Sequence, residues 1–199
     1  MNPSSLAVIG VTDRPGAFGH AAAVNTVESA IKDHVYFVHP KRDQLYGRKC
    51  YKTLDELPEI VDCIVICTPR NSVISYLEQA GKLGIGGAVI YASGFSEEHS
   101  EEGRELENKI VEISRKYDMA VLGPNCAGIM NNEDKVNLWG LKTSFDIHTR
   151  RGGIGIIAQS GFITENLLNN EYFNISYAIS SGNGNATKLE DFFIAMVDD

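Results

Sequence analysis

Residues 6–20 constrain the fold of this chain more than any other stretch. An apolar run at 6–9 meets a loop that holds Gly10, Gly16 and Gly19, and a helix-forming segment rich in alanine follows. Glycines let the backbone turn tightly and come close to a phosphate, which the N–H groups at the start of the next helix can bind. The pattern predicts the opening of a nucleotide-binding βαβ unit. An ordinary glycine-rich turn between a strand and a helix is the alternative for this loop taken alone.

The spacing of this loop differs from the dinucleotide-binding fingerprint G-x-G-x-x-G. Thr12 stands in place of the second glycine, and the loop is longer. The second apolar run, at 35–38, ends in His-Pro-Lys-Arg, whereas an NAD-binding unit usually has an acid there for the adenosine ribose. Cations at this tip, Lys41 and Arg42, favour a ribose that carries a phosphate, as in NADP or the 3′-phospho-ADP end of coenzyme A. A solvated basic turn is the alternative for this feature.

Apolar runs and helix-forming segments continue to alternate along the chain. Further strands are predicted at 63–67, 88–91 and 120–122. Helices are predicted over 20–32 and 97–117, and a third helix is predicted between the strand at 63–67 and about residue 83. Asn71 or Ser72 is the expected cap of the middle helix, and residues 45–58 predict an irregular connection with a short helix capped by Thr53. This alternation is typical of an α/β fold, here a Rossmann-like, doubly wound parallel sheet.

Five loops of this predicted sheet follow the carboxyl ends of strands. They lie at Gly10, Pro40, Thr68, Ser93 and Asn125. Ligands of open α/β sheets bind beyond the carboxyl ends of the strands. We therefore expect these loops to lie along one edge and to share one ligand.

Residues 131–152 break the alternation with polar residues and a tryptophan, and we interpret them as a crossover linker. The linker separates a first domain, residues 1–130, from the start of a second, flavodoxin-like α/β domain, residues 153–199. Its expected elements are strand 154–158, a helix from about Phe162, strand 175–179 and helix 189–197. Two strands and two helices form a poor independent sheet, so this part either packs on the first domain or lacks a C-terminal continuation.

Composition limits the class of protein. Hydrophobic residues make up 43% and charged residues 22% of the 199 positions, as in globular proteins, and the net charge of −8 argues against a nucleic-acid partner. The sequence shows no secretory signal and no apolar run of ~18 residues, so we expect no membrane span. The four cysteines, at positions 50, 63, 67 and 126, contain no CxxC pair. They predict no metal site and no disulfide framework, and they favour a reducing cytoplasm.

The loop sequences form an ordered set. They read Gly-Val-Thr-Asp-Arg-Pro-Gly-Ala-Phe-Gly, Val-His-Pro-Lys, Gly-Arg-Lys-Cys-Tyr, Cys-Thr-Pro, Ala-Ser-Gly-Phe, Leu-Gly-Pro-Asn-Cys-Ala-Gly-Ile, Ala-Gln-Ser-Gly and Ser-Gly-Asn. Together they resemble the N-terminal, CoA-binding part of the NDP-forming acyl-CoA synthetases, relatives of the succinyl-CoA synthetase α subunit. The resemblance covers nearly the whole chain and depends on the order of the motifs rather than on any single one.

This resemblance implies a set of residues that bind coenzyme A. The diphosphate would lie on the first loop, at Gly10, Thr12, Arg14, Pro15, Gly16, Phe18 and Gly19. Pro40 and Lys41 would lie at the 3′-phospho-adenosine end, Thr68, Pro69, Ser93 and Gly94 would line the cofactor, and Asn125 and Cys126 would lie near the pantetheine thiol. A nucleophilic Cys126 is the less favoured interpretation, because no general base adjoins it in the sequence.

The resemblance also implies a phosphate site in the second part. Ser160 and Gly161 would hold a phosphohistidine at a helix N-terminus, where N–H groups and the helix dipole favour an anion. A plain serine N-cap is the alternative, and a G-x-S-x-G nucleophile elbow is excluded because Ala158 replaces the first glycine. The family's catalytic histidine lies in a Gly-His-Ala-Gly-like segment that none of the five histidines here matches. We therefore predict no catalytic residue in this chain.

The complete reaction of the family would join a carboxylic acid to CoA through a phosphohistidine and an acyl-phosphate, using ATP or GTP with magnesium. A missing C-terminal portion or a partner subunit would carry the phosphohistidine and the nucleotide-grasp domain, so we expect the isolated chain to be inactive. Two other functions stay open at this point. One is a non-catalytic CoA or acyl-CoA sensor, such as the regulatory domain of an acyltransferase, and the other is an NAD(P)-binding redox protein.

Overall fold

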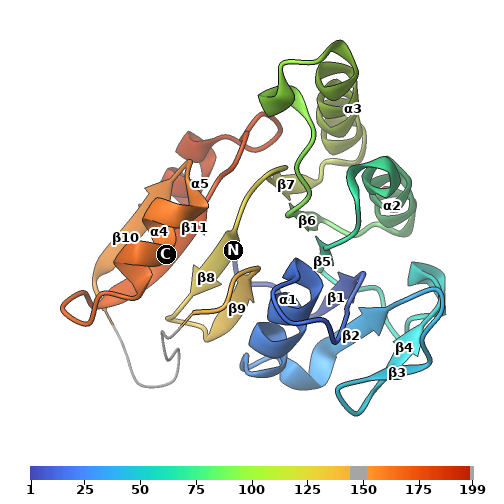
Figure 1. Ribbon diagram of the computed structural model, residues 1–199, viewed down its shortest axis with the longest axis horizontal. Helices are drawn as coiled ribbons and strands as arrows, with labels where there is room; N and C mark the ends of the chain where they lie inside the picture. Colours follow the sequence, from blue (N-terminus) through green and yellow to red (C-terminus); the bar gives the residue numbers. More distant parts are fainter. Residues whose placement is uncertain (144–151, 198–199) are drawn as a thin grey trace.

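The computed structural model describes residues 1–143 and 152–197, which form two sheets (Figure 1). The seven-stranded sheet has the order β3-β4-β2-β1-β5-β6-β7, and all its neighbours run parallel except β3 and β4. Its strands are β1 (Leu6–Ile9), β2 (Val35–Val38), β3 (Gln44–Leu45), β4 (Arg48–Tyr51), β5 (Cys63–Ile66), β6 (Gly87–Ile90) and β7 (Ala120–Leu122). This largely parallel sheet confirms the predicted Rossmann-like α/β fold.

The four-stranded sheet has the order β10-β11-β8-β9, and only β10 and β11 run parallel in it. Its strands are β8 (Gly128–Asn131), β9 (Val136–Trp139), β10 (Ile154–Ala158) and β11 (Ile175–Ser180). The helices are α1 (Phe18–Val27), α2 (Arg70–Leu83), α3 (Glu101–Tyr117), α4 (Gly161–Leu168) and α5 (Leu189–Val197), with short 3₁₀ helices η1 (Lys32–His34), η2 (Leu54–Glu56) and η3 (Ser96–Glu98).

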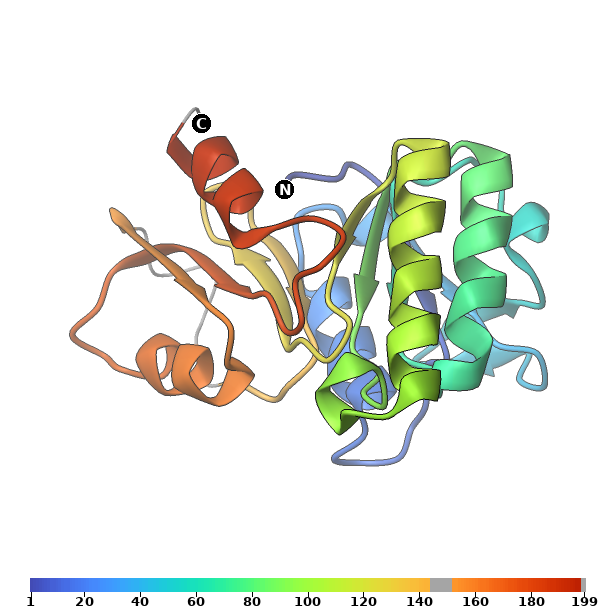
Figure 2. The ribbon, with the colours of Figure 1, turned by 90° about the horizontal axis from the view of Figure 1, so that it is seen from above.

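Strand β1 lies in the middle of the first sheet and is completely buried. It pairs in register with β2 on one side and with β5 on the other. Because side chains alternate along a strand, Leu6 and Val8 enter one hydrophobic core with α1, while Ala7 and Ile9 enter a second core with α2 and α3. Helices α2 and α3 lie side by side over that second face (Figure 2). Helices on both faces explain why the strands are uniformly apolar.

The stretch 45–58 is more regular than expected. Strand β4 extends the sheet parallel to β2, with Cys50 opposite Phe37, and the two-residue β3 folds back on it. Only Cys50 of β4 is buried, so the sequence carries little strand signal there. Thr53 occupies the N-cap position of η2, but its side chain makes no capping hydrogen bond.

Two helix starts also differ from the predicted ones. Helix α2 begins at Arg70 with Pro69 in the N-cap position, so neither Asn71 nor Ser72 caps it. Helix α3 begins later than expected, and Ser100 caps it by accepting a hydrogen bond from the Gly103 N–H (3.0 Å).

The predicted linker, residues 131–152, contributes to the second sheet. Strands β8 and β9 form an antiparallel hairpin, and β8 pairs with β11 from the other side of the linker. Strand β9 is buried because α1 packs on it, and the Asn25 side chain donates to the Trp139 carbonyl oxygen (2.7 Å). The domain boundaries at 130 and 152 stay a prediction, and residues 144–151 of the linker lie outside the described residues.

The second sheet packs on the first through the β8–β9 hairpin. The Tyr91 hydroxyl, at the end of β6, donates to the Leu138 carbonyl oxygen of β9 (2.9 Å). Figure 1 shows the β8–β9 hairpin between the first sheet and the β10–β11 pair. Among residues 1–143 and 152–197, no helix has the length and apolar character needed to cross a membrane.

Replacement of Leu77 tests how much the second core contributes to stability. Leu77 lies on α2 and has no exposed surface. We expect Leu77→Ala to lower the free energy of unfolding by about 2–5 kcal/mol, because apolar contacts are lost and a cavity remains. Urea denaturation of the full chain measures this change. Asn71→Ala, at an exposed position of the same helix, is the control and should change it by less than about 0.5 kcal/mol. Equal small losses in both variants would contradict the prediction.

Candidate functional site

The first loop crosses the carboxyl edge of the sheet in close contact with its neighbours. The Gly10 N–H donates to the Val38 carbonyl oxygen (3.1 Å), which joins the ends of β1 and β2. Gly10 has φ +82°, and a Cβ there would lie 2.6 Å from Cγ2 of Thr68, after β5. A Cβ on Gly19 would lie 2.2 Å from the Gly10 carbonyl oxygen. Helix α1 can therefore begin this close to the strand only with glycine at that position.

The outer bend of this loop is open to solvent. Arg14, Pro15 and Gly16 are exposed, and the Arg14 N–H donates to the Thr12 hydroxyl (3.3 Å). Helix α1 starts at Phe18 without a side-chain cap. The N–H groups of His20 and Ala21 donate to the Ala17 carbonyl oxygen (3.0 and 3.2 Å), so the N–H groups of Phe18 and Gly19 are the ones at this helix start that could serve an anion.

Two residues hold the loop in place: Tyr46, which sequence reasoning missed, and Arg42, which it expected to favour a phosphate instead. The Tyr46 hydroxyl, from the turn between β3 and β4, donates to the Thr12 carbonyl oxygen (2.8 Å) and accepts from Nδ1 of His20 (2.5 Å). From the tip of β2, Arg42 forms an ion pair with Asp13 of the loop (3.4 Å). The glycine loop, the β2 tip and the β3–β4 turn thus form one connected surface.

His39 shapes the basic tip of β2. Its Nδ1 accepts hydrogen bonds from the N–H groups of Lys41 (3.1 Å) and Arg42 (3.0 Å), so the turn closes around a neutral imidazole. Burial, and then the charges of Arg42, Lys52 and Lys41, lower the pKa of His39. The lowered pKa favours the uncharged ring that this hydrogen-bonding pattern requires.

Lys41 differs from the other cations of this tip. Arg42 is paired with Asp13, and Lys52 is paired with Asp43 (2.6 Å). Lys41 is exposed and forms no ion pair within the part of the chain that the structure describes. Its charge is the one at this tip that remains available to a phosphate.

Arg70 connects the loops that follow β5 and β6. Its guanidinium donates to the Gly94 carbonyl oxygen (2.6 Å) and forms ion pairs with Glu98 (2.9 Å) and Glu102 (3.1 Å). Gly94 has φ +99°, and a Cβ there would lie 2.7 Å from Cδ of Arg70. The other predicted lining residues flank this connection, with Thr68 half-buried and Pro69 and Ser93 exposed.

The turn after β7 presents Asn125 to the edge but directs Cys126 inward. The Asn125 N–H donates to the Ala92 carbonyl oxygen (2.9 Å), which joins this turn to the end of β6. The Cys126 sulfur lies 3.3 Å from the Ile90 carbonyl oxygen, and the residue is 4% exposed. Burial raises the pKa of the Cys126 thiol to about 12. A packing role for this side chain is therefore favoured over a nucleophilic one.

These contacts connect the ends of β2, β1, β5, β6 and β7 in the order of the sheet. Over the strand ends, the ring of Phe18 stacks on that of Tyr91, with 5.4 Å between centroids.

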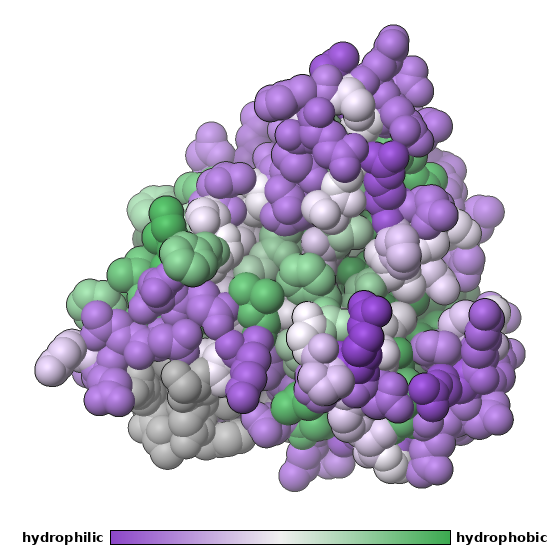
Figure 3. Space-filling view, viewed as in Figure 1, coloured by the Kyte–Doolittle hydropathy of each residue, from purple (hydrophilic) through white to green (hydrophobic). Residues whose placement is uncertain are grey.

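A cleft of about 670 Å³ opens between α1 and α4, with Pro15 and Gly16 on one side and Phe162 on the other. Figure 3 shows apolar atoms in the middle of this face, surrounded by polar ones. The predicted loops thus lie along one edge.

Ser160 and Gly161 open helix α4 close to the turn after β7. The Ser160 hydroxyl accepts from the Ile163 N–H at 3.5 Å, which makes Ser160 the N-cap. A Cβ on Gly161 would lie 2.7 Å from Cβ of Ala127. The serine cap is present, and phosphate binding at this helix stays a prediction. Within the described residues, no group of three or more histidine, cysteine, aspartate or glutamate side chains could hold a metal ion.

Residues 4–132 match the family model described as a CoA binding domain. The chain belongs to this family of CoA-binding domains. It is 37% identical over its whole length to trans-feruloyl-CoA synthase FCS1 of an unknown prokaryotic organism, and covers 29% of that protein. It is 35% identical, over 92% of its length, to acetate–CoA ligase [ADP-forming] II subunit alpha of Pyrococcus furiosus, and covers 39% of that subunit. The chain thus spans well under half the length of these relatives.

A solved structure extends the likeness to the fold. The dinucleotide-forming acetyl-coenzyme A synthetase 1 of Candidatus Korarchaeum cryptofilum, in complex with phosphate and ADP, matches all of this chain with a TM-score of 0.89 and 31% identity. The match covers 42% of that structure. Fold and sequence both fit the CoA-binding portion of an ADP-forming acyl-CoA synthetase, as the ordered motifs predicted.

Removal of the Tyr46 hydroxyl tests whether the clamp on the glycine loop matters for CoA. We expect Tyr46→Phe to weaken CoA binding about two- to thirteenfold, since a hydrogen bond worth about 0.5–1.5 kcal/mol no longer holds the loop. Isothermal titration calorimetry measures the affinity. Tyr172→Phe is the matched control, because Tyr172 lies between α4 and β11 and is 93% exposed. This variant should bind CoA as tightly as the unaltered chain does. Unchanged affinity in Tyr46→Phe would contradict a role for the clamp.

The burial of Cys126 predicts a slow reaction with alkylating reagents. Burial raises the pKa of this thiol, so very little of it is ionised at pH 8. In the folded chain we expect iodoacetamide to leave Cys126 unmodified while the same peptide is labelled rapidly in urea, as read by mass spectrometry. Labelling should accelerate as the pH rises, because only the thiolate reacts. Rapid labelling of the folded chain at pH 8 would show that the thiol is accessible and reactive.

Proposed function

We propose that this chain binds coenzyme A as the CoA-binding portion of an ADP-forming acyl-CoA synthetase. The observation that carries the proposal is the glycine loop, fixed against Thr68 and the tip of β2, with the free charge of Lys41 beside it. Likeness to such synthetases over the whole chain supports the same assignment. A loop of this kind suits a diphosphate, and a lone cation at the next strand suits a terminal phosphate.

In this proposal each end of CoA has its own group of residues. The diphosphate accepts hydrogen bonds from the uncapped start of α1, with Arg14 at the exposed bend of the loop. The 3′-phosphate lies at Lys41, and the pantetheine arm passes Gly94 toward Asn125. The contacts that connect the strand ends in sheet order support this path, because one extended ligand can touch all of them.

The proposed reaction joins a carboxylic acid to the CoA thiol at the expense of a nucleoside triphosphate, which is ATP if ADP is formed and would be GTP in a GDP-forming enzyme. A phosphate passes through a histidine to the acid, and the CoA sulfur then displaces phosphate from the acyl-phosphate. Ser160 and Gly161 would bind the phosphohistidine at the start of α4, as the sequence resemblance implies. The phosphohistidine and the nucleotide site, with its magnesium, belong to a further portion or partner subunit, since relatives extend well beyond the matched region. The four free cysteines support a reducing compartment, the cytoplasm.

The role of Lys41 is tested with two ligands that differ by one phosphate. We expect the full chain to bind CoA about tenfold more tightly than 3′-dephospho-CoA in calorimetry, because a charge-assisted contact of ~1.4 kcal/mol is lost with the phosphate. Lys41→Ala should remove most of that difference and leave the affinity for 3′-dephospho-CoA unchanged. Lys109→Ala, an exposed lysine on α3, is the control and should keep the difference.

Two outcomes would contradict this proposal. Equal affinity of the unaltered chain for CoA and 3′-dephospho-CoA would remove the role given to Lys41. Binding of NADPH without binding of CoA would replace the proposed function by that of a redox protein.

A further inference from the structure

The loop after β6 is held by a carboxylate. The N–H groups of Gly94 and Phe95 donate to the two oxygens of Glu97, at 2.6 and 3.2 Å. Charge-assisted hydrogen bonds of this kind are strong and directional. The position of Gly94, a residue of the predicted CoA site, therefore depends on where the Glu97 side chain is held.

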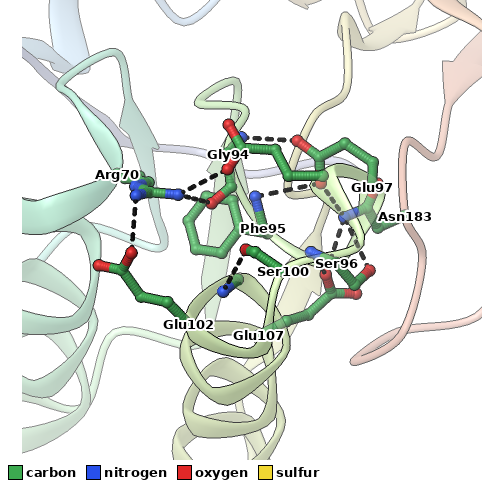
Figure 4. A network of polar contacts seen from close by, with 11 residues as sticks. Arg70, Gly94, Phe95, Ser96, Glu97, Ser100, Glu102, Glu107 and Asn183 are labelled. Carbon is green, nitrogen blue, oxygen red and sulfur yellow. Dashed lines mark hydrogen bonds and ion pairs between the residues drawn. The ribbon is translucent and has the colours of Figure 1, made fainter.

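A side chain from the second sheet holds Glu97. Asn183 lies in the loop that follows β11, and its Nδ2 donates to Oε2 of Glu97 (2.7 Å) and to Oε2 of Glu107 (2.8 Å), as Figure 4 shows. Glu107, on α3, is 3% exposed and also accepts from the Ser96 N–H (2.9 Å). An amide nitrogen carries two hydrogens, which suits the two carboxylates at 2.7 and 2.8 Å, and the Ser96 hydroxyl oxygen lies farther from the same nitrogen, at 3.3 Å. Asn183 thus bridges two like charges that would otherwise repel each other at low local dielectric.

The other end of Asn183 contacts the second predicted CoA loop. Its Oδ1 accepts from Nδ2 of Asn125 (3.4 Å), and its N–H donates to the Pro124 carbonyl oxygen (2.9 Å). The adjacent Gly182 has φ +60°, and a Cβ there would lie 2.2 Å from the same Pro124 oxygen. The loop after β11 therefore comes into backbone contact with the turn that carries Asn125, and glycine permits it.

Electrostatics are consistent with this arrangement. Burial disfavours the charged form of Glu97, but hydrogen bonds from Asn183 and from the N–H groups of Gly94 and Phe95 outweigh it and lower the pKa of the carboxyl. Glu97 is therefore charged at neutral pH. Removal of the Asn183 amide would leave two carboxylates facing each other with a donor missing.

We propose that Asn183 is a positioning residue of the CoA site, which holds the loop of Ser93 and Gly94 through Glu97 and contacts Asn125 with the same side chain. The second sheet then helps to shape the site that the first sheet carries. This inference rests on the proposed CoA-binding function. Asn183 itself is not assigned to contact CoA.

Asn183→Ala and Asn185→Ala in the full chain form a matched pair for the test. Asn185 also donates to Glu107, but its described hydrogen bonds do not include Glu97 or Asn125. We expect Asn183→Ala to weaken CoA binding about five- to tenfold in calorimetry. Hydrogen exchange at the Gly94 and Phe95 amides should become faster in the absence of any ligand. Asn185→Ala should change the affinity less than about twofold and leave that exchange unchanged. Urea unfolding of both variants separates these local effects from a general loss of stability.

A second variant keeps the test decisive if Asn183→Ala folds poorly. Asn183→Asp has nearly the same shape but places a third carboxylate against Glu97 and Glu107. We expect a larger loss of CoA affinity than in Asn183→Ala at pH 8, and partial recovery at pH 5.5, where a protonated carboxyl can donate again. Affinities are compared with the unaltered chain at each pH, which cancels the titration of CoA itself.

The outcomes separate this inference from the function on which it rests. Unchanged CoA affinity and unchanged Gly94 exchange in both Asn183 variants would overturn the positioning role while leaving CoA binding intact. Equal losses in Asn183→Ala and Asn185→Ala would also overturn it, because the effect would then be general destabilisation. Failure of the unaltered chain to bind CoA would overturn the proposed function, and with it the assignment of Asn183 to a CoA site. The exchange measurement would then still report whether Asn183 holds the loop.

Discussion

The burial of strand β1 is the constraint on which the rest of the structure depends. The strand is paired on both edges and covered on both faces, so its carboxyl end has a single possible position. The glycine loop begins there and must turn at once, since Gly10 already lies against Thr68. Gly19 then lets α1 start against the carbonyl oxygen of Gly10. The geometry of the proposed phosphate site therefore follows from packing alone, before any ligand is considered.

The second sheet helps to hold the loops at the carboxyl edge of the first sheet. Its hairpin β8–β9 covers α1, and the Tyr91 hydroxyl reaches its backbone. On the other side, the loop after β11 lies against Pro124 and places an amide between Glu97 and Glu107. The loops along the edge of the first sheet are therefore held by contacts with residues that follow them in the chain.

Local patterns predicted the parts of the fold that local chemistry determines. The apolar runs gave the central strands of the first sheet, and the glycine loop and the basic tip of β2 were placed together as expected. Strand β4 was missed because only Cys50 in it is buried. The clamp from Tyr46 to Thr12 joins residues 34 positions apart, and the contact of Asn183 with Glu97 joins residues 86 positions apart. Asn183 stands in the Ser-Gly-Asn motif, but neither its local sequence nor that of Tyr46 indicates the distant partner of the side chain.

The charged side chains at the edge of the sheet have two different roles. The chain carries a net charge of −8. Arg42 at the β2 tip and Lys52 after β4 are paired with Asp13 and Asp43, so these two cations shape the turn more than they attract a ligand. Lys41 alone remains unpaired there among the described residues. An exposed charge acts over about 8–10 Å before salt screens it. In the proposed CoA complex, the glycine loop would fix the diphosphate and thereby bring the 3′-phosphate within this range of Lys41. Backbone geometry would then set the position of the ligand, and the single lysine would add selectivity for the terminal phosphate.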